Sequence, residues 1–191
     1  MDETAHNGVD WSRRRMLAGV GAGALTLGLA PIGSALARTA GSDVRGLSLV
    51  NLHTSEKISI DYFAGGAYIP DALRELNRFM RDPIDGSRYN MNPALYDLLN
   101  SIYALMDTPR PFHLISGYRS PSTNAMLRRR SRGVAKRSLH MSGLAADIRL
   151  PGRDIKYLAR AAKALKRGGV GMYSRSNFVH VDTGRVRTWG G

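Results

Sequence analysis

Two spacings of apolar residues divide the middle of the chain into predicted strands and helices. Residues 47–53 and 57–62 are rich in strand-forming residues, and the polar stretch 54–56 between them predicts a hairpin. Residues 71–81 and 93–106 carry apolar side chains three and four positions apart, which predicts two amphipathic helices. In the second helix we expect one buried stripe, made by Leu95, Leu98, Leu99, Ile102, Leu105 and Met106.

The same two patterns continue to the end of the chain. Strands are predicted at 112–116, 145–150, 170–173 and 178–181, and helices at 121–130 and 154–167. Gly168 and Gly169 follow the last helix and are typical of a helix end. This mixture predicts an α+β fold, with a small antiparallel sheet and helices packed mainly on one face.

Residues 1–37 have the pattern of an export signal. Arginines follow Ser12, an uncharged Gly/Ala-rich stretch covers 18–30, and residues 35–37 read Ala-Leu-Ala, which is typical of a cleavage site. The paired arginines indicate a twin-arginine-type signal peptide, so we expect a signal at 1–37, a domain at 38–191 and a location in the periplasm or cell envelope. The stretch is poor as a membrane span because of its glycines and Pro31. Membrane contact is therefore expected only through an uncleaved signal, if at all.

Composition narrows the possible chemistry and partners. The 191 residues include no cysteine, which excludes disulfides, thiol nucleophiles and cysteine-ligated metals. The net charge is +13, and all of it belongs to residues 38–191, which hold 25 of the 28 basic and 12 of the 15 acidic residues. Such a charge predicts a polyanionic partner, namely nucleic acid, anionic lipid or a cell-wall polymer. Export favours the wall and argues against nucleic acid, and the six basic residues within 128–137 then form a rim facing the polymer.

Two histidines lie in patterns that could bind a metal. His140 opens the pattern H-x-x-G-x-A-x-D, which ends at Asp147, and His180 lies in a predicted strand with Asp182 on the same side. A hydrolytic zinc site needs three protein ligands and an open position for water. A turn at Gly143 followed by a strand would bring His140 and Asp147 onto one ion, with His180 on a neighbouring strand as the third ligand. Spacing alone leaves open the alternative that these histidines only make structural hydrogen bonds.

The order of three motifs resembles a known peptidase group. The run Ser116-Gly117-Tyr118-Arg119-Ser120, then the His140–Asp147 pattern, then His180 is similar to the zinc D-alanyl-D-alanine peptidases, whose fold lysostaphin-type peptidases and the hedgehog signalling domain share. Within that group the chain resembles the murein endopeptidase K branch, over roughly residues 47–189. The resemblance implies Zn²⁺ held by His140, Asp147 and His180, and it implies that Arg119 binds a substrate carboxylate. Ser116 and Tyr118 would orient the substrate or merely pack.

One position departs from the group's pattern. Many relatives place an acidic general base three residues before the last histidine ligand, where this chain has Asn177. Asp182 is the nearest alternative base; otherwise it fixes a ligand in place. The resemblance implies a metallopeptidase that hydrolyses peptide bonds in peptidoglycan stem peptides or cross-links, acting as endopeptidase or carboxypeptidase. A non-catalytic wall-binding module with the same fold is the alternative, and nothing in the sequence indicates an oligomeric state.

Overall fold

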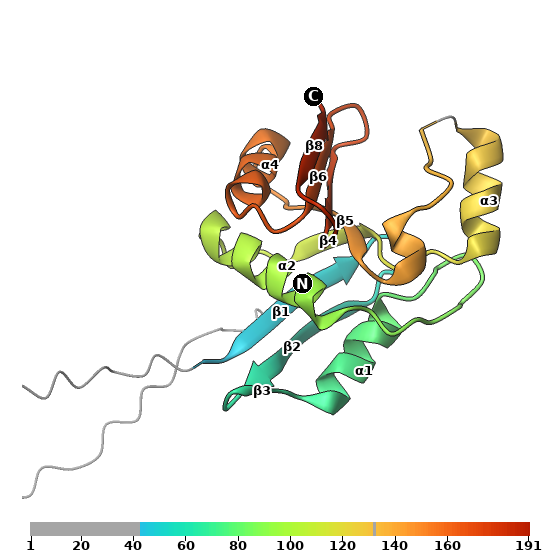
Figure 1. The fold of residues 1–191 in the computed structure, drawn as a ribbon. Coiled ribbons are helices and arrows are strands. Elements are labelled where there is room, and N and C mark those ends of the chain that lie inside the picture. Colours follow the sequence, from blue (N-terminus) through green and yellow to red (C-terminus); the bar gives the residue numbers. More distant parts are fainter. Residues whose placement is uncertain (1–42, 132) are drawn as a thin grey trace, which may run out of the picture. The chain divides into compact units, whose positions relative to one another are not determined.

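Eight strands form one mixed sheet in the part of the chain that the computed structural model describes, residues 43–131 and 133–191. Their order across the sheet is β3-β2-β1-β4-β5-β7-β6-β8 (Figure 1). The predicted signal, residues 1–37, lies outside the described residues, and Thr39–Gly191 forms one compact unit. The strands are β1 Arg45–Asn51, β2 Lys57–Ala64, β3 Ala67–Tyr68, β4 Phe112–Ser116, β5 Ala145–Arg149, β6 Gly169–Tyr173, β7 Phe178–Asp182 and β8 Arg187–Gly190.

The sheet is larger than the small antiparallel sheet expected from the sequence, although the α+β class is confirmed. Two neighbouring pairs, β1 with β4 and β6 with β8, run parallel, whereas the other pairs are antiparallel. The segment between β1 and β4 is long enough to hold a hairpin and two helices, and so it allows a parallel crossover. Strands β3 and β8 have two and four residues, too few for a recognisable alternation of apolar and polar residues.

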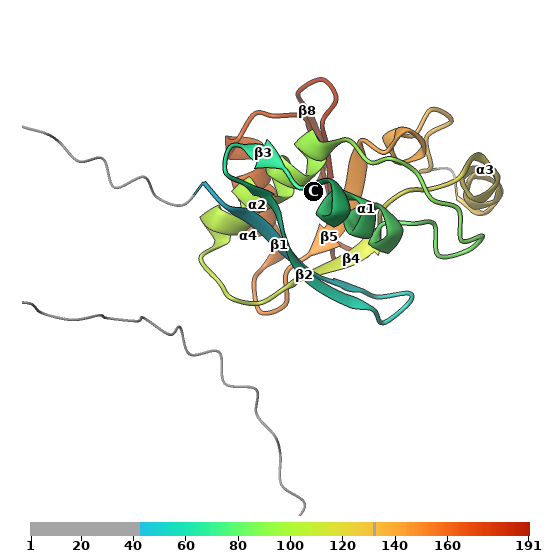
Figure 2. The same cartoon turned by 90° about the horizontal axis from the view of Figure 1, so that it is seen from below.

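Three of the four α-helices in the described part of the chain cover one face of this sheet. They are α1 Pro70–Phe79 against β2, α2 Pro93–Met106 against β1, and α4 Ile155–Ala164 against β6 and β7. The fourth, α3 Pro121–Arg130, stands apart from them in both views (Figures 1 and 2). Side chains cap three of the helices: Asn92, Ser120 and Asp154 each accept a hydrogen bond from a backbone N–H of the first turn.

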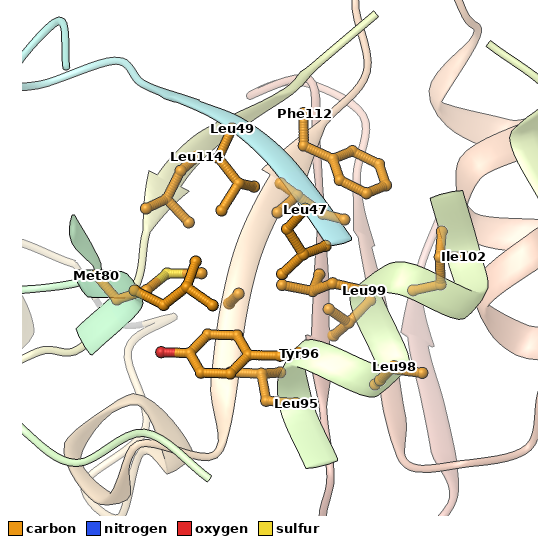
Figure 3. Packing of buried hydrophobic residues seen from close by; sticks show 14 of the residues in the cluster. Leu47, Leu49, Met80, Leu95, Tyr96, Leu98, Leu99, Ile102, Phe112 and Leu114 are labelled. Atoms are coloured by element: carbon orange, nitrogen blue, oxygen red, sulfur yellow. The ribbon is translucent and has the colours of Figure 1, made fainter. Parts of the chain in front are cut away.

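The hydrophobic core lies between this sheet face and the helices. Leu47 and Leu49 of β1 and Leu114 of β4 meet the stripe of α2 there (Figure 3). On β7 the core side chains are Val179 and Val181, so the residues between and beside them point to the opposite face. The prediction of a buried stripe on α2 is wrong for one residue, because Leu105 is 55% exposed. None of the helices in the described part is long and apolar enough to cross a membrane.

Candidate metal centre

The face of the sheet that the core leaves free carries two of the predicted ligands side by side. Asp147 of β5 is paired with His180 of β7, and paired residues on neighbouring strands point to the same side. The third ligand lies on the 3₁₀ turn Leu139–Ser142, directly before β5. This turn ends at Gly143 in the left-handed region (φ 65°), and a Cβ there would lie 2.8 Å from the ring of Tyr89. Glycine is therefore required where the chain turns from His140 into β5.

One atom from each of these three residues converges on a common point. His180 Nδ1 lies 2.9 Å from Asp147 Oδ1, and His140 Nε2 lies 3.2 Å from the same oxygen. The two ring nitrogens are 3.1 Å apart. Three donor atoms so close together, from two imidazoles and one carboxylate, could hold one metal ion.

The other nitrogen of each imidazole has its own partner. His140 Nδ1 donates to the carbonyl oxygen of Gly117 at 2.7 Å, and His180 Nε2 donates to Asp182 Oδ2 at 3.0 Å. These hydrogen bonds fix the proton on the outer nitrogen of each ring and leave the lone pair of the inner nitrogen free. Metal-binding histidines in proteins are usually oriented in this way.

Electrostatics keep the acid of this cluster ionised. Burial alone would raise the pKa of Asp147, but the two histidines outweigh it and hold that pKa well below its usual range. For His180, burial favours a lower pKa, whereas the hydrogen bonds with Asp147 and Asp182 raise it above the ordinary value. Negative charge around the cluster therefore favours a cation, either a proton on His180 or a metal ion.

Asp182 is buried beside His180 and accepts a hydrogen bond from it. Its side chain has no exposure to solvent. Oδ1 accepts from the backbone N–H groups of Gly169 and Gly184 and from Arg187, and Oδ2 accepts from His180 and Arg187. Burial would raise the pKa of Asp182, but these hydrogen bonds hold it well below its usual range. These contacts fit the second of the two roles that the sequence left open for this residue, and the role of a general base stays a prediction.

Arg119 lies beside the cluster, and a local irregularity of β4 places it there. The ladder between β4 and β5 shifts between Leu114 and Ser116, so that Ser116 is paired with Asp147 and shares its face. Arg119 Nη2 donates to the Ser116 hydroxyl at 3.3 Å and lies 3.6 Å from Asp147 Oδ2. The guanidinium therefore has a fixed position at the edge of the ligand set.

Tyr118 packs instead of facing this site. Its ring stacks on that of Tyr89 with 5.0 Å between centroids, and its side chain is buried. Of the two residues that the sequence left between substrate orientation and packing, Ser116 therefore supports Arg119, and Tyr118 belongs to the packing.

Sequence reasoning missed the two carboxylates that fix the Arg119 loop. Asp82 is fully buried and accepts the backbone N–H of Ser120 at 2.8 Å and that of Ile84 at 2.9 Å. Asp85 accepts from the Ser120 hydroxyl at 2.5 Å. Both lie in the segment that the sequence identified only as a break after the first helix. The available signal was an Asp-rich turn, but its binding partner, Ser120, is 35 or more positions away in the sequence.

A cavity of about 500 Å³ opens over the ligands. One wall is aromatic and consists of Tyr173, Phe178 and Trp189, and the ring of Trp189 lies 5.3 Å from that of His180. Further lining comes from Ser131, Gly133, Val134, Ala135, Ser138 and Arg137, the last at the end of the basic cluster. Among the described lining residues, Asp147 is the only carboxylate, whereas Arg119, Arg137 and Arg187 supply positive charge.

Asn177, the position at which an acidic base was expected, does not line this cavity. It lies in the turn between β6 and β7 with φ 52° and borders a second cavity, together with His113 and Arg149. An acid at this position would not face the ligands in this structure. Asn177 therefore contributes no group to the lining of the cavity over the ligands.

The sequence of the chain matches one family over most of its length. Residues 39–189 match the family described as peptidoglycan L,D-endopeptidase MepK. This chain belongs to the MepK family. It is 44% identical over 181 residues to peptidoglycan L,D-endopeptidase MepK of Escherichia coli strain K12. The alignment covers 94% of this chain and 98% of that protein. These matches confirm the resemblance of the sequence motifs to the murein endopeptidase branch of the peptidase group.

Two further comparisons place the chain among known proteins. The probable peptidoglycan L,D-endopeptidase MepK of Haemophilus influenzae is 39% identical over 186 residues, 97% of this chain and 99% of that one. Among solved structures, the L-Ala D-Glu endopeptidase ChiX of Serratia marcescens aligns with 50% of this chain and 69% of its own, at 21% identity and a TM-score of 0.34. That score is too low to carry an argument, and the assignment rests on the MepK sequences.

Proposed function

We propose that this chain is an exported, zinc-dependent peptidoglycan L,D-endopeptidase, the activity for which its MepK relatives are named, and that the bonds it cleaves are L,D cross-links. The observation that carries the proposal is the convergence of His140 Nε2, Asp147 Oδ1 and His180 Nδ1 within 3.2 Å of one another. Neutral imidazole and carboxylate donors in a set of three fit a catalytic zinc ion, which keeps its fourth position for water or substrate.

Zinc would supply the Lewis acid of the reaction, and the residues around the ligands would orient them to bind it. A zinc ion held by these three residues would supply a Lewis acid that polarises a carbonyl group and lowers the pKa of a coordinated water. The Gly117 carbonyl and Asp182 keep both imidazoles in the tautomer that can bind it. Asp182 is therefore a positioning residue in this proposal.

The charge of the cavity fits a substrate that carries carboxylates. Stem peptides joined by L,D cross-links present free carboxylates next to the scissile bond. Arg119 has a planar fork that can bind a carboxylate through two parallel hydrogen bonds, and Ser116 holds it 3.6 Å from Asp147. In this proposal Arg119 binds one substrate carboxylate and sets the register of the peptide over the ligands.

A defined substrate pair tests the proposal. Residues 38–191 are incubated with a muropeptide dimer cross-linked between two diaminopimelates and, separately, with one cross-linked between D-alanine and diaminopimelate, and the products are identified by mass spectrometry. We expect the L,D-linked dimer to be cut, activity to disappear with a chelator, and zinc to restore it. His140→Ala should be inactive while its melting temperature stays close to that of the parent protein measured with chelator. Unchanged activity in this variant would exclude the metal mechanism.

Export is tested apart from catalysis. Residues 1–37 are fused to a reporter that is active only after translocation in a folded state, and the fusion is compared with an Arg13→Lys/Arg14→Lys pair. We expect export of the parent signal and loss of export in the variant, because the twin-arginine route depends on those two residues. Equal export of both fusions would contradict the twin-arginine route and leave the catalytic proposal intact.

The wall-binding alternative depended on the absence of an acid at position 177, a position that borders a different cavity from the ligands. Binding to purified wall without release of any product would still favour it over the enzyme.

A further inference from the structure

Helix α4 presents a row of cations to solvent. Lys156, Arg160 and Lys163 follow one another at spacings of four and three residues, which places them along one side of the helix, and Arg167 follows beyond the helix end; all four are exposed. Arg153 and Lys166 flank the row and are also exposed. We call these six residues the α4 basic surface.

The charge of this surface is not neutralised locally. None of the described carboxylates forms an ion pair with any of the six side chains. Asp154, the acid next to the row, is used as the N-cap of the helix and accepts the backbone N–H of Lys156. Arg153 donates to the carbonyl oxygens of Met106 and Asp107 at the end of α2, which ties the surface to that helix without cancelling its charge.

Apolar side chains occupy a groove beside the cations. The groove lies between the end of α2 and α4 and is lined by Leu105, Met106, Tyr157, Ala161 and Ala164, together with Arg153 and Arg160. Leu105 and Tyr157 are each 55% exposed, and the guanidinium of Arg160 lies 4.8 Å from the centre of the Tyr157 ring. This explains why Leu105 departs from the buried stripe of its helix: it belongs to an outer surface that combines an aromatic ring, an aliphatic side chain and cations.

This surface lies on the far side of the sheet from the ligands. Helix α4 packs against β7 on the side of Val179 and Val181, whereas His180 points to the other face. A partner bound to α4 would therefore leave the cavity over His140 and His180 open. The other basic cluster, at 128–137, contributes Arg137 to the cavity and so belongs to the catalytic side.

We propose that the α4 basic surface docks this protein on an anionic lipid bilayer, with Leu105 and Tyr157 inserted at the headgroup level. Cations that surround exposed aromatic and aliphatic side chains on one helical surface fit the interface of a bilayer, where lipid phosphates meet acyl chains. A polysaccharide or nucleic acid would match the cations but offers no acyl phase for Leu105. The inference is independent of the proposed peptidase activity, since no ligand residue belongs to the surface.

Vesicle binding tests the proposal directly. Residues 38–191 hold the complete core, so they are used without the apolar signal and mixed with phosphatidylglycerol/phosphatidylcholine vesicles or with pure phosphatidylcholine vesicles, followed by co-sedimentation. We expect binding to the anionic vesicles only, decreasing as salt is added. Lys156→Glu/Arg160→Glu should weaken it about tenfold or more, because each cation near such a surface contributes about fivefold.

Two further variants separate the bilayer from other polyanions. Arg128→Glu/Arg129→Glu on α3 changes the net charge by the same amount and should retain the vesicle binding of the parent protein. Leu105→Asn removes no charge and should also weaken binding to anionic vesicles, whereas binding to a purely electrostatic polyanion such as heparin should not change. Equal losses in the α3 and α4 charge variants would overturn the proposal, as would binding that is insensitive to Leu105→Asn. Circular dichroism confirms that each variant is folded, and hydrolysis of soluble muropeptides by the α4 variant should equal that of the parent protein.

Discussion

Asp182 Oδ2 accepts a hydrogen bond from His180 Nε2 at 3.0 Å, and Arg187 donates to both oxygens of the same carboxylate, at 2.7 and 3.0 Å. This chain of contacts runs from β8 through the end of β7 to the metal centre. It explains how His180 keeps Nδ1 directed at Asp147 and His140 while Nε2 is held by Asp182. The orientation of His180 thus depends on a strand that provides no ligand itself.

Replacing Asp182 by asparagine separates a positioning role from a catalytic one. We expect Asp182→Asn to weaken zinc binding about 10- to 100-fold, because the partner of a ligating histidine loses its charge. At saturating zinc, however, kcat should stay within about tenfold of the parent value. Zinc affinity is measured by competition with a chromophoric chelator, and kcat on a cross-linked muropeptide dimer. A loss of 10²–10⁴ in kcat at full zinc occupancy would instead identify Asp182 as the general base.

Replacing Arg119 should impair the use of the substrate more than the binding of the metal. In Arg119→Lys the charge remains but the planar fork is lost, so we expect kcat/KM to fall at least about tenfold with no change in bound zinc. Ser116→Ala removes one hydrogen bond to Arg119 at 3.3 Å and should cause a smaller loss of the same kind. Steady-state kinetics with metal analysis of the same samples checks both. Arg119 has no substrate role if a dimer amidated at its carboxylates shows the same loss in Arg119→Lys as the free acid.

Asp82 should stabilise the loop that carries Arg119. In Asp82→Ala the buried backbone N–H of Ser120 loses its acceptor, which costs about 1–3 kcal/mol, and the more exposed N–H of Ile84 loses its acceptor as well. We expect a lower free energy of unfolding in urea and a reduced kcat/KM. Asp85→Asn is the matched control, since Asp85 is exposed and its loss should destabilise the protein less. Equal effects of the two variants would contradict the role given to Asp82.

Zinc binding should weaken at mildly acidic pH. The pKa of His180 is raised above its ordinary value of about 6.5, so its imidazole still carries a proton at a pH where a free histidine has lost it. Because this proton competes with the metal, zinc affinity should be constant at higher pH and decrease about tenfold per pH unit below that raised pKa. In Asp182→Asn the decrease should begin at lower pH. Competition titrations between pH 5.5 and 8.5 measure the onset, and an onset below 6 in the parent protein would contradict the prediction.

Gly171 should be required for the position of Trp189. A Cβ at position 171 would lie 2.4 Å from the Trp189 ring, which in turn lies 5.3 Å from the ring of His180. Gly171→Ala should therefore displace the tryptophan, lower activity and shift its fluorescence. Gly133→Ala is the control, because a Cβ there meets only the Ser131 hydroxyl at 3.7 Å. A variant at 171 with parental fluorescence and activity would show that the ring is free to adjust.

The convergence of three residues was predicted better than their surroundings, for a physical reason. Alternation along β7 and the turn at Gly143 are local features that agree with the convergence of His140, Asp147 and His180, and the resemblance to a peptidase group singled out these three residues. The contacts of Asp182 come from Arg187 and Gly169 on other strands, and no local pattern reports such distant partners. The same holds for Leu105, which lies exposed in the groove between α2 and α4 although its helical spacing matches that of buried residues.

The shift in the β4–β5 ladder was also beyond the reach of local patterns. Simple alternation places Ser116 on the same side as Leu114, in the core, whereas the irregularity between them turns Ser116 toward Asp147. The sequence therefore identified Ser116 and Arg119 through a motif, and only the structure explains why they face the ligands.

The two ligands on the sheet and one part of the cavity lining have different structural origins. Asp147 and His180 lie on adjacent inner strands, with further strands on both sides. The aromatic wall also comes from strands, whereas Ser131, Gly133, Val134, Ala135 and Arg137 belong to the connection between α3 and the 3₁₀ turn. Changes in this connection would therefore alter the outline of the cavity without disturbing the strands that carry Asp147 and His180, which makes it the segment to vary when cleavage of a different peptide bond is sought.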